Sequence, residues 1–454
     1  MQTLKKGTFI RRFLKVLLIT IAFCLAIALF LFAPIDRKDW RDKEELYQKY
    51  QTSLQAIIPS DSVKGKLKAG WAKISILPSE PIPIASYGIR EKNTGVHDSL
   101  WCRAVVLDNG IRKVAMVTID LLIFPPALTE RLQVILKEKG YPLENTYFSA
   151  THTHNAPGGW AEKLGGRFLA GKYNEDYVEQ LTKAVVESIE LAEADLKEAS
   201  IGFGRYEAKE LIENRFSNKA KDLDHWLRLI KIQKVSGENA LIVSYAAHPT
   251  ILSSTINELS GDYAGALVNS LEKDSLIDFA AFYAGAVGAH VCRGYEGVDY
   301  EAIKQVSDYL KGIALKNFNS IEVKDSVRLH SFNVPVYLDD PQLKVSPNWK
   351  LRPWVFHFLL GKQSVFLSAL RIEDMVFIGT PCDFGGELLK HFSEVSEERK
   401  LKLVITSFNG GYIGYIVPDE YYDLPLRESR DMSWYGPHNA DYFTELIREI
   451  LKKI

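Results

Sequence analysis

The chain has 454 residues, of which 46% are hydrophobic and 25% are charged, values typical of folded globular proteins that exclude wholesale disorder. The 56 basic and 57 acidic residues give a formal net charge of -1, and no basic stripe is interleaved with aromatic side chains. Nucleic acid is therefore not expected as a partner. The four cysteines are far apart and form no CxxC pair, so they indicate neither a cysteine-rich zinc module nor a disulfide framework. No feature indicates an oligomeric state.

An uncharged apolar run at residues 16–35 is the clearest local feature of the chain. At about 1.5 Å per residue, a helix of this length crosses a hydrocarbon core of about 30 Å. The basic tail before it, residues 1–15, carries five Lys or Arg and no acid, as signal and signal-anchor segments do. Small residues are missing from the usual cleavage spacing, which favours a retained transmembrane signal-anchor over a cleaved signal. A buried core helix is the alternative.

The rest of the chain divides into two parts. Residues 36–68 begin with dense charge and a partial helical period of apolar residues, which predicts a juxtamembrane stalk. Residues 69–454 alternate short β-rich runs with longer helical ones, which predicts one α/β domain with mixed β-sheets flanked by helices. Strands are expected at 114–120, 147–151, 226–235 and 240–246, and helices at 127–139 and 174–197. The aromatic segment 349–360 is either core or an apolar flap that meets lipid.

Two histidine motifs follow predicted strands. The string Thr-His-Thr-His-Asn-Ala-Pro-Gly-Gly occupies residues 151–159, and two-residue alternation along a strand would put His152 and His154 on one face. Two such imidazoles can share a metal ion, or one can bind it while the other moves protons. An HxH pair alone is a weak signal, and His248, at the end of another buried run, would alone more often be a core histidine. Their common position at strand ends nevertheless matches the location of active sites in α/β sheets.

Several strings in fixed order extend this pattern. After Thr-His-Thr-His come Asn214-Arg215, Ala-x-His-Pro at 246–249, Ser-Gly-Asp-Tyr at 260–263, Tyr-x-x-Tyr at 412–415 and Tyr-Gly-Pro-His at 435–438. In order and spacing, from about residue 70 to 440, the chain resembles the catalytic domain of the neutral (alkaline, non-lysosomal) ceramidase family. The resemblance implies a hydrolase with one zinc ion per chain.

The resemblance also implies the zinc ligands. They would be His152, His248, Tyr412 and a carboxylate near residue 383. Asp383 fits the family's Pro-Gly-Glu-Phe string with Asp in place of Glu, and we favour it over Glu387, which fits only the Gly-Glu pair. Asp is an ordinary zinc ligand, so the exchange alone does not abolish binding.

The expected chemistry is zinc-assisted attack of water on an amide carbonyl. His154 is expected to act as general acid or base, Arg215 to orient the polar end of the substrate, and Asp262 to support a ligand. Where the family has Gly-Asp-x-Ser-Pro-Asn, with a serine implicated in catalysis, this chain has neither the acid nor the serine at residues 288–293. His290 and Cys292 are the candidates to replace that function.

The implied reaction is cleavage of ceramide or another N-acyl lipid to a fatty acid and a sphingoid base. The family's secretory habit, with the basic tail, predicts a single-pass membrane protein whose catalytic domain lies on the extracytoplasmic side. Two other hypotheses stay open. One is a non-catalytic, membrane-anchored relative with a structural or lost metal site, favoured by the altered string at 288–293. The other is a zinc hydrolase that acts on a different bond.

Overall fold

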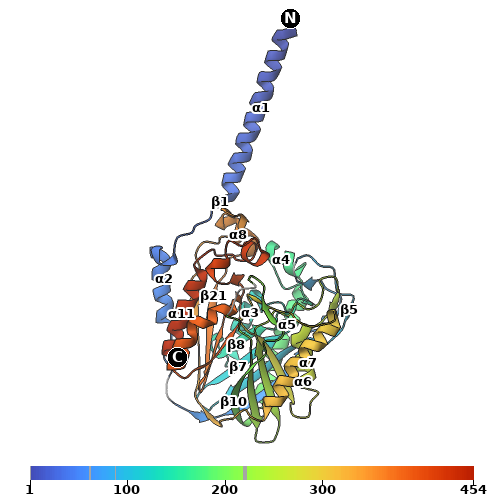
Figure 1. The fold of residues 1–454 in the computed structure, drawn as a ribbon, viewed down its shortest axis with the longest axis vertical. Coiled ribbons are helices and arrows are strands. Elements are labelled where there is room, and N and C mark those ends of the chain that lie inside the picture. The colour runs from blue at the N-terminus through green and yellow to red at the C-terminus, as the bar shows by residue number, and fades with distance from the viewer. Residues whose placement is uncertain (1, 61–62, 87, 218–221) are drawn as a thin grey trace.

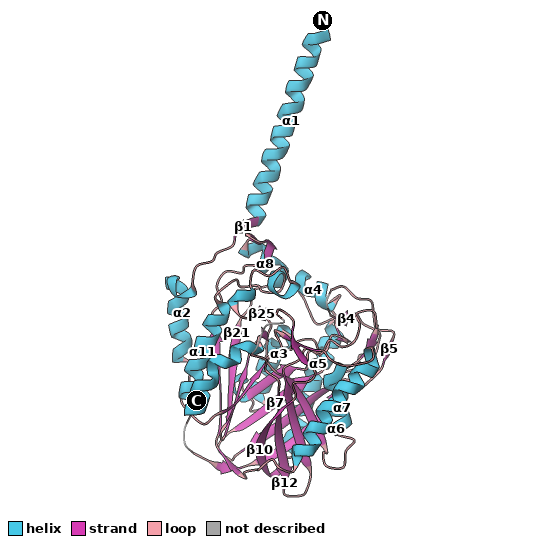
Figure 2. Cartoon of the chain, viewed as in Figure 1, coloured by secondary structure: helices cyan, strands magenta, loops and turns pink. Residues whose placement is uncertain are grey.

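The computed structural model describes residues 2–60, 63–86, 88–217 and 222–454. Two β-sheets lie inside the domain, and helices cover their outer faces (Figure 1; Figure 2). The larger sheet has the order β15-β13-β12-β10-β3-β6-β7-β8, and the smaller one has the order β18-β21-β22-β24. This arrangement confirms the predicted α/β class with mixed sheets.

The strands of the larger sheet, in sheet order, are Phe279–Ala284, Asn239–Tyr245, Trp226–Lys234, Lys197–Glu207, Lys68–Ser75, Trp101–Asp108, Lys113–Ile119 and Thr146–Ala150. Those of the smaller sheet are Leu329–Val336, Val365–Ile372, Met375–Gly379 and Lys402–Thr406. The helices are α1 Gln2–Leu31, α2 Glu44–Gln55, α3 Pro126–Glu138, α4 Leu164–Ala170, α5 Glu175–Ala194, α6 Asp262–Leu271, α7 Asp299–Phe318, α8 Pro353–Leu360, α9 Ser393–Glu398, α10 Arg427–Arg430 and α11 Asn439–Lys453.

Short strands complete the fold. A three-stranded sheet joins β1 Phe32–Pro34, β20 Trp349–Leu351 and β19 Lys344–Ser346. The two-stranded pairs are β11 Ile212–Asn214 with β16 His290–Cys292, β23 Asp383–Phe384 with β25 Tyr415–Ile416, β14 Glu258–Leu259 with β5 Gly95–Val96, β17 Ser326–Val327 with β2 Gly65–Lys66, and β4 Ile84–Ala85 with β9 Ala156–Pro157.

Successive side chains along each strand point to opposite faces of the sheet, so the two sheets contribute to two separate apolar cores. One core lies between the sheets and joins Val105, Met116 and Ile242 of the larger sheet to Leu370 and Phe377 of the smaller one. The other faces of both sheets pack against helices: α5 on β3 and β6, α6 on β15, α7 on β12, and α2 on β18. Burial of these apolar faces, at about 25 cal/mol per Å², is the main force that holds the layers together.

The strands and helices expected from periodicity are present, with their ends shifted by at most three residues. Residues 114–120, 147–151, 226–235 and 240–246 correspond to β7, β8, β12 and β13, and residues 127–139 and 174–197 correspond to α3 and α5. The segment 349–360 combines both alternatives left open for it. Phe356 is fully buried in the core, whereas Trp354 is 46% exposed and Phe358 is 67% exposed.

Residues 36–68 differ from the expected stalk. Trp40 is only 4% exposed and packs edge-to-face on Tyr442 of α11, at 5.2 Å between ring centroids. Tyr50 of α2 is buried beside it, and β2 at residues 65–66 pairs with β17. The apolar face that suggested a helix here needs a partner, and α11 and β18 provide it. This segment is thus part of the domain surface.

Among the described residues, one helix is long and apolar enough to cross a membrane, at Arg11–Leu31 of α1. Length and composition alone support this, and a signal sequence passes the same test. The helix ends at Leu31, a few residues before the end of the apolar run, because Phe32–Pro34 form strand β1 and pair with β20.

The carboxyl ends of strands from both sheets meet at one place. Edge strands β8 and β15 of the larger sheet contact each other. Ser407, after β24, donates its backbone N–H to Ala284 at the end of β15 (2.9 Å), and Gly285 donates to Tyr245 at the end of β13 (3.0 Å). The Asn409 amide donates to the Phe148 carbonyl of β8 at 2.5 Å. The loops that follow these strands carry the candidate functional residues.

Candidate metal centre

His152 and His154 converge at the end of β8, but not by simple strand alternation. The strand stops at Ala150, and His152 has a φ of 67°, in the left-handed region that side chains other than glycine rarely adopt. Its ring stacks on Phe408 at 3.9 Å, and its Nε2 lies 3.2 Å from Nε2 of His154. Left-handed backbone at a buried non-glycine residue costs conformational free energy, and residues in this conformation cluster at functional sites. The expected common face is present, and a local turn produces it.

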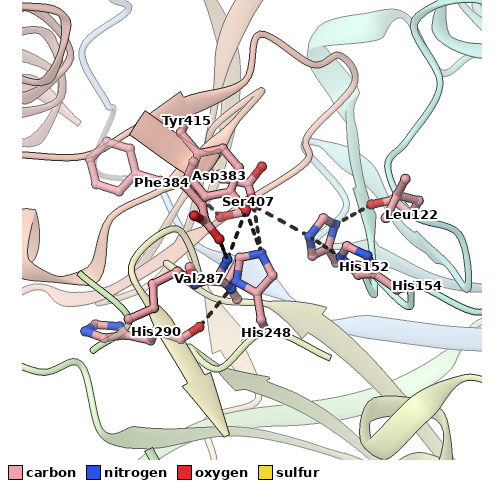
Figure 3. A network of polar contacts seen from close by, with 12 residues as sticks. Leu122, His152, His154, His248, Val287, His290, Asp383, Phe384, Ser407 and Tyr415 are labelled. Atoms are coloured by element: carbon pink, nitrogen blue, oxygen red, sulfur yellow. Dashed lines mark hydrogen bonds and ion pairs between the residues drawn. The ribbon is translucent and has the colours of Figure 1, made fainter. Parts of the chain in front are cut away.

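His248 enters from the loop after β13. Its ring centroid lies 4.7 Å from that of His152, at an interplanar angle of 78°. Its backbone N–H donates to the His290 carbonyl at 3.1 Å, and its Nδ1 lies 2.8 Å from the Val287 carbonyl oxygen. Two segments separated by nearly a hundred residues thus present imidazoles to one point (Figure 3).

The ring hydrogen bonds determine which nitrogens face that point. A carbonyl oxygen only accepts, so Nδ1 of His152, 2.5 Å from the Leu122 carbonyl, carries the hydrogen, as Nδ1 of His248 does toward Val287. In neutral rings, Nε2 of both residues then presents a lone pair. Burial lowers the pKa of His152 to about 3 and the pKa of His248 well below its usual value, which keeps both rings neutral.

Asp383 lies directly opposite these lone pairs. Its Oδ1 is 3.1 Å from Nε2 of His248 and 3.5 Å from Nε2 of His152 (Figure 3). Since neither nitrogen carries a hydrogen, Oδ1 has no donor there and is a buried acceptor without a hydrogen-bond partner. Burial raises the pKa of Asp383. A buried carboxylate oxygen that faces two nitrogen lone pairs needs a cation between them.

The separations fit a shared metal ion. Ligands bound tetrahedrally at about 2.0–2.1 Å lie about 3.3 Å from one another, which is the spacing of Asp383 Oδ1 from the two rings. The ligand atoms of His152, His154 and His248 all lie within 4.8 Å of one another. We call His152, His154, His248 and Asp383 the histidine centre. Its nitrogen and carboxylate donors are of the types that zinc accepts.

Both tyrosines of the Tyr-x-x-Tyr string reach the histidine centre. The Tyr412 hydroxyl donates to Oδ2 of Asp383 at 2.7 Å, and the Tyr415 hydroxyl lies 3.1 Å from Nε2 of His248. Parallel pairing of β23 with β25 places Tyr415 beside Asp383. The sequence assigned a ligand role to Tyr412 alone, although the string itself contained the second tyrosine.

Arg215 lies at the edge of the centre. Its guanidinium donates to Glu428 at 2.6 Å and to the Tyr415 hydroxyl at 3.4 Å. Burial works against the charge, but neighbouring Tyr415 and Glu428 raise the pKa of Arg215, so it stays cationic. Glu428 belongs to no string that the sequence analysis singled out, and its role is visible only in the folded chain.

Three predicted residues lie elsewhere. Glu387 accepts a hydrogen bond from the Asn214 amide and does not line the cavity at the centre. The buried ring of His290 packs against Gly386 and turns away from the centre, so it contributes its carbonyl oxygen and not its imidazole (Figure 3). Cys292 is buried as well, and burial raises the pKa of its thiol. Neither side chain lines the cavity in the described part of the chain.

Asp262 acts on the loop that follows His248. Its carboxylate accepts the backbone N–H groups of Ile251 at 3.0 Å and of Leu252 at 3.1 Å. It therefore holds the loop that carries His248 without touching the histidine itself. This differs in detail from the support that the sequence predicted for it.

A cavity of about 740 Å³ leads from the histidine centre toward the surface. Its walls are mostly apolar, with Leu122, Ile123, Trp160, Leu169 and Leu360 among the lining residues. Charged residues away from the centre, namely Glu130, Glu162, Lys163 and Lys362, also line it. A cavity of this size with mostly apolar walls is typical of sites for small organic ligands.

The fold and the centre define an α/β protein with a buried site that can hold a metal ion. Residues 82–290 match the family model described as neutral/alkaline non-lysosomal ceramidase, N-terminal. The match supports the resemblance seen in the sequence: over these residues the chain is similar to the neutral ceramidase family. His152, His154, Arg215 and His248 fall inside the matched residues, whereas Asp383 and both tyrosines lie beyond them.

Two curated relatives are similar to part of the chain. The neutral ceramidase of Pseudomonas aeruginosa is 23% identical over an alignment of 222 residues that covers 45% of this chain and 33% of that protein. The neutral ceramidase of Mycobacterium tuberculosis is 25% identical over an alignment of 199 residues that covers 39% of this chain and 31% of that protein. The aligned region thus spans about a third of the length of these relatives.

Two solved structures share the fold. The crystal structure of the neutral ceramidase from Pseudomonas aeruginosa superposes with a TM-score of 0.72 at 18% identity, covering 85% of this chain and 74% of that one. A ceramidase complexed with C2 gives a TM-score of 0.71 at 17% identity, with 85% and 75% covered. At these identities the likeness shows the fold.

Proposed function

We propose that the protein is a zinc-dependent amidase that cleaves the N-acyl bond of ceramide, or of a related N-acyl lipid, to a fatty acid and a sphingoid base. The observation that carries the proposal is the histidine centre, with an acceptor oxygen facing two nitrogen lone pairs, at the inner end of an apolar cavity. The similarity of residues 82–290 to the neutral ceramidase family supports the choice of substrate.

Zinc would be held by His152, His248, Asp383 and a tyrosine hydroxyl, assigned to Tyr412 from the family resemblance. A zinc ion bound there would polarise the amide carbonyl and lower the pKa of water. The second tyrosine, Tyr415, bridges His248 to Arg215 through its hydroxyl.

The remaining chemistry belongs to the chain's own side chains. His154 lies in the cavity wall beside His152 and is placed to move a proton between the attacking water and the leaving amine. Arg215 lines the same cavity and offers hydrogen-bond donors to the polar end of the substrate. The apolar walls receive acyl or sphingoid chains and exclude bulk water from the centre. Since residues 288–293 supply no serine hydroxyl, proton transfer falls to His154.

The test is turnover of a short-chain ceramide by the purified, zinc-loaded full chain in detergent. We expect release of a fatty acid and a sphingoid base. Tyr415→Phe serves as a comparison variant, because it keeps the fold and removes one hydroxyl group from the polar wall of the cavity. If the zinc-loaded chain releases neither product, the protein is a non-catalytic relative. If it cleaves an ester analogue and not the amide, it is a hydrolase of another bond.

We further propose that α1 is a retained membrane anchor and that the domain lies on the extracytoplasmic side. Within α1, an uncharged apolar stretch at residues 16–31 follows a basic first half that has no acidic residue, and this supports the arrangement. Protease added to sealed cells should digest the domain. Digestion that requires lysis would show the opposite orientation.

A further inference from the structure

The junction between α1 and the domain is held by hydrogen bonds. Strand β1 follows α1 without a linker and pairs antiparallel with β20 over Phe32–Pro34. Arg352 donates its backbone N–H to the Leu31 carbonyl at 2.9 Å and its Nε to the Leu29 carbonyl at 2.8 Å. The Trp354 indole donates to the Phe30 carbonyl at 3.3 Å, and the two rings lie 4.8 Å apart. The direction of α1 relative to the domain is therefore fixed.

Exposed aromatic side chains gather beside this junction. Outside α1, every Phe or Trp exposed among the described residues, namely Phe168, Trp349, Trp354 and Phe358, belongs to α4, β20 or α8. Leu164 of α4 is also exposed. Helices α4 and α8 pack together, and both lie at the end of the domain from which α1 emerges (Figure 1). We call Leu164, Phe168, Trp349, Trp354 and Phe358 the α4–α8 surface.

The cavity reaches this same surface. Trp354 and Phe358 of α8 line it, together with Gly166 and Leu169 of α4. The other end of the cavity is the histidine centre. The cavity thus connects the histidine centre to the side of the domain at which α8 and the end of α1 lie (Figure 2).

We propose that the α4–α8 surface rests in the interface of the membrane that α1 enters, and that a lipid substrate passes from this bilayer between α4 and α8 into the cavity. Trp and Phe favour the membrane interface, where an apolar ring contacts acyl chains and the indole N–H still finds a polar partner. In water, a cluster of this kind would be a liability. Continuity with α1 identifies the partner as a lipid bilayer. The membrane contact rests on the proposed anchor role of α1, and the passage of substrate rests in addition on the proposed amidase activity.

Depth-dependent quenching tests the membrane contact. The full chain carries Cys24→Ser, which removes the exposed cysteine; the other three are buried. A fluorophore is attached at Phe168→Cys or Phe358→Cys. The matched control is Val235→Cys, 80% exposed in the turn after β12, at the end of the domain far from α1 (Figure 2).

The labelled chains are reconstituted in phosphatidylcholine vesicles with brominated acyl chains. Labels at 168 and 358 should be quenched, most strongly by bromines about 5–10 Å below the headgroup boundary, and the label at 235 should not. Equal quenching at all three positions, or none, would overturn the proposal, because the domain would then tumble freely on its anchor.

A second experiment separates this proposal from the proposed function. Leu164→Ser combined with Phe168→Ser changes two exposed side chains that do not line the cavity. The variant should hydrolyse a soluble short-chain ceramide like the wild type, and a long-chain ceramide in its own bilayer more slowly. Equal rates on the bilayer substrate would overturn the route. A wild-type chain inactive on both substrates would refute the proposed function, while the label positions would still decide the membrane contact.

Discussion

Replacing Asp383 with Asn tests the geometry of the histidine centre most sharply. The amide has nearly the same shape, and its NH₂ group can donate to the Nε2 lone pair of His248, 3.1 Å from the present Oδ1. The variant therefore needs no cation at this point. Since burial raises the pKa of Asp383, it also removes an unfavourable buried charge. We expect Asp383→Asn to fold at least as stably as the metal-free wild type and to respond much less to zinc.

The size of the expected zinc response follows from the linkage between zinc binding and unfolding. Free zinc at 100 times the dissociation constant stabilises the wild type by about 2.7 kcal/mol. With an unfolding entropy of about 0.8 kcal/mol/K for a domain of this size, this corresponds to a rise of about 3 °C in Tm. If the variant binds about 100-fold more weakly, the same zinc concentration gives about 0.4 kcal/mol, or about 0.5 °C.

Thermal unfolding of the chelator-treated full chain, with and without zinc, measures this difference. Glu387→Gln is the matched control, because Glu387 is also a buried carboxylate and was the alternative ligand. It should keep the full zinc response. The reasoning is refuted if Asp383→Asn responds like the wild type while Glu387→Gln loses its response.

Three further predictions concern the same centre. His154→Gln should lower kcat by about 10²–10⁴-fold and keep its zinc, since a positioned acid or base contributes about that much; loss of zinc would instead make His154 a ligand. Tyr412→Phe removes a hydrogen bond to Asp383 and should weaken zinc binding at least about 10–100-fold, measured by competition with a chelator; unchanged affinity, with loss in Tyr415→Phe, would transfer the ligand role to Tyr415. Because burial lowers the pKa of His152 to about 3, its neutral, ligating form persists as pH falls below the ordinary value of about 6.5. Zinc content after equilibration at pH 8 and pH 5.5 should therefore be equal, and a release of zinc centred near pH 6.5 would contradict the burial argument.

Much of the fold could be predicted because its signals are local. Buried strands such as β7 and β13 are mostly apolar runs, and α5 has one apolar face, so period and length identify them. The prediction of a stalk at residues 36–68 failed because the signal was local but the contact was not. Its apolar face was visible in the sequence, but the partner that covers it, α11, lies at the other end of the chain.

The candidate site was only partly visible. His152, His154, His248 and Asp383 stand in short strings that follow strands, and the folded chain brings all four together. Whether the ring of His290 turns toward the centre depends on packing against Gly386, which no string encodes.

Contacts between segments that are distant in the sequence could not be predicted either, because no single segment encodes them. The pairing of β23 with β25 brings Tyr415 to Asp383, and α10 brings Glu428 to Arg215. These are properties of the assembled loops and not of any one segment.

The central claim is that the histidine centre binds zinc and that this zinc is required for amide hydrolysis. The most direct test measures zinc content and short-chain ceramide turnover on one preparation of the full chain, before chelation, after it, and after zinc is returned. The account predicts about one zinc per chain, turnover that disappears with the metal, and recovery of both together. Turnover that survives in the zinc-free chain, or a fully zinc-loaded chain without turnover, would contradict it.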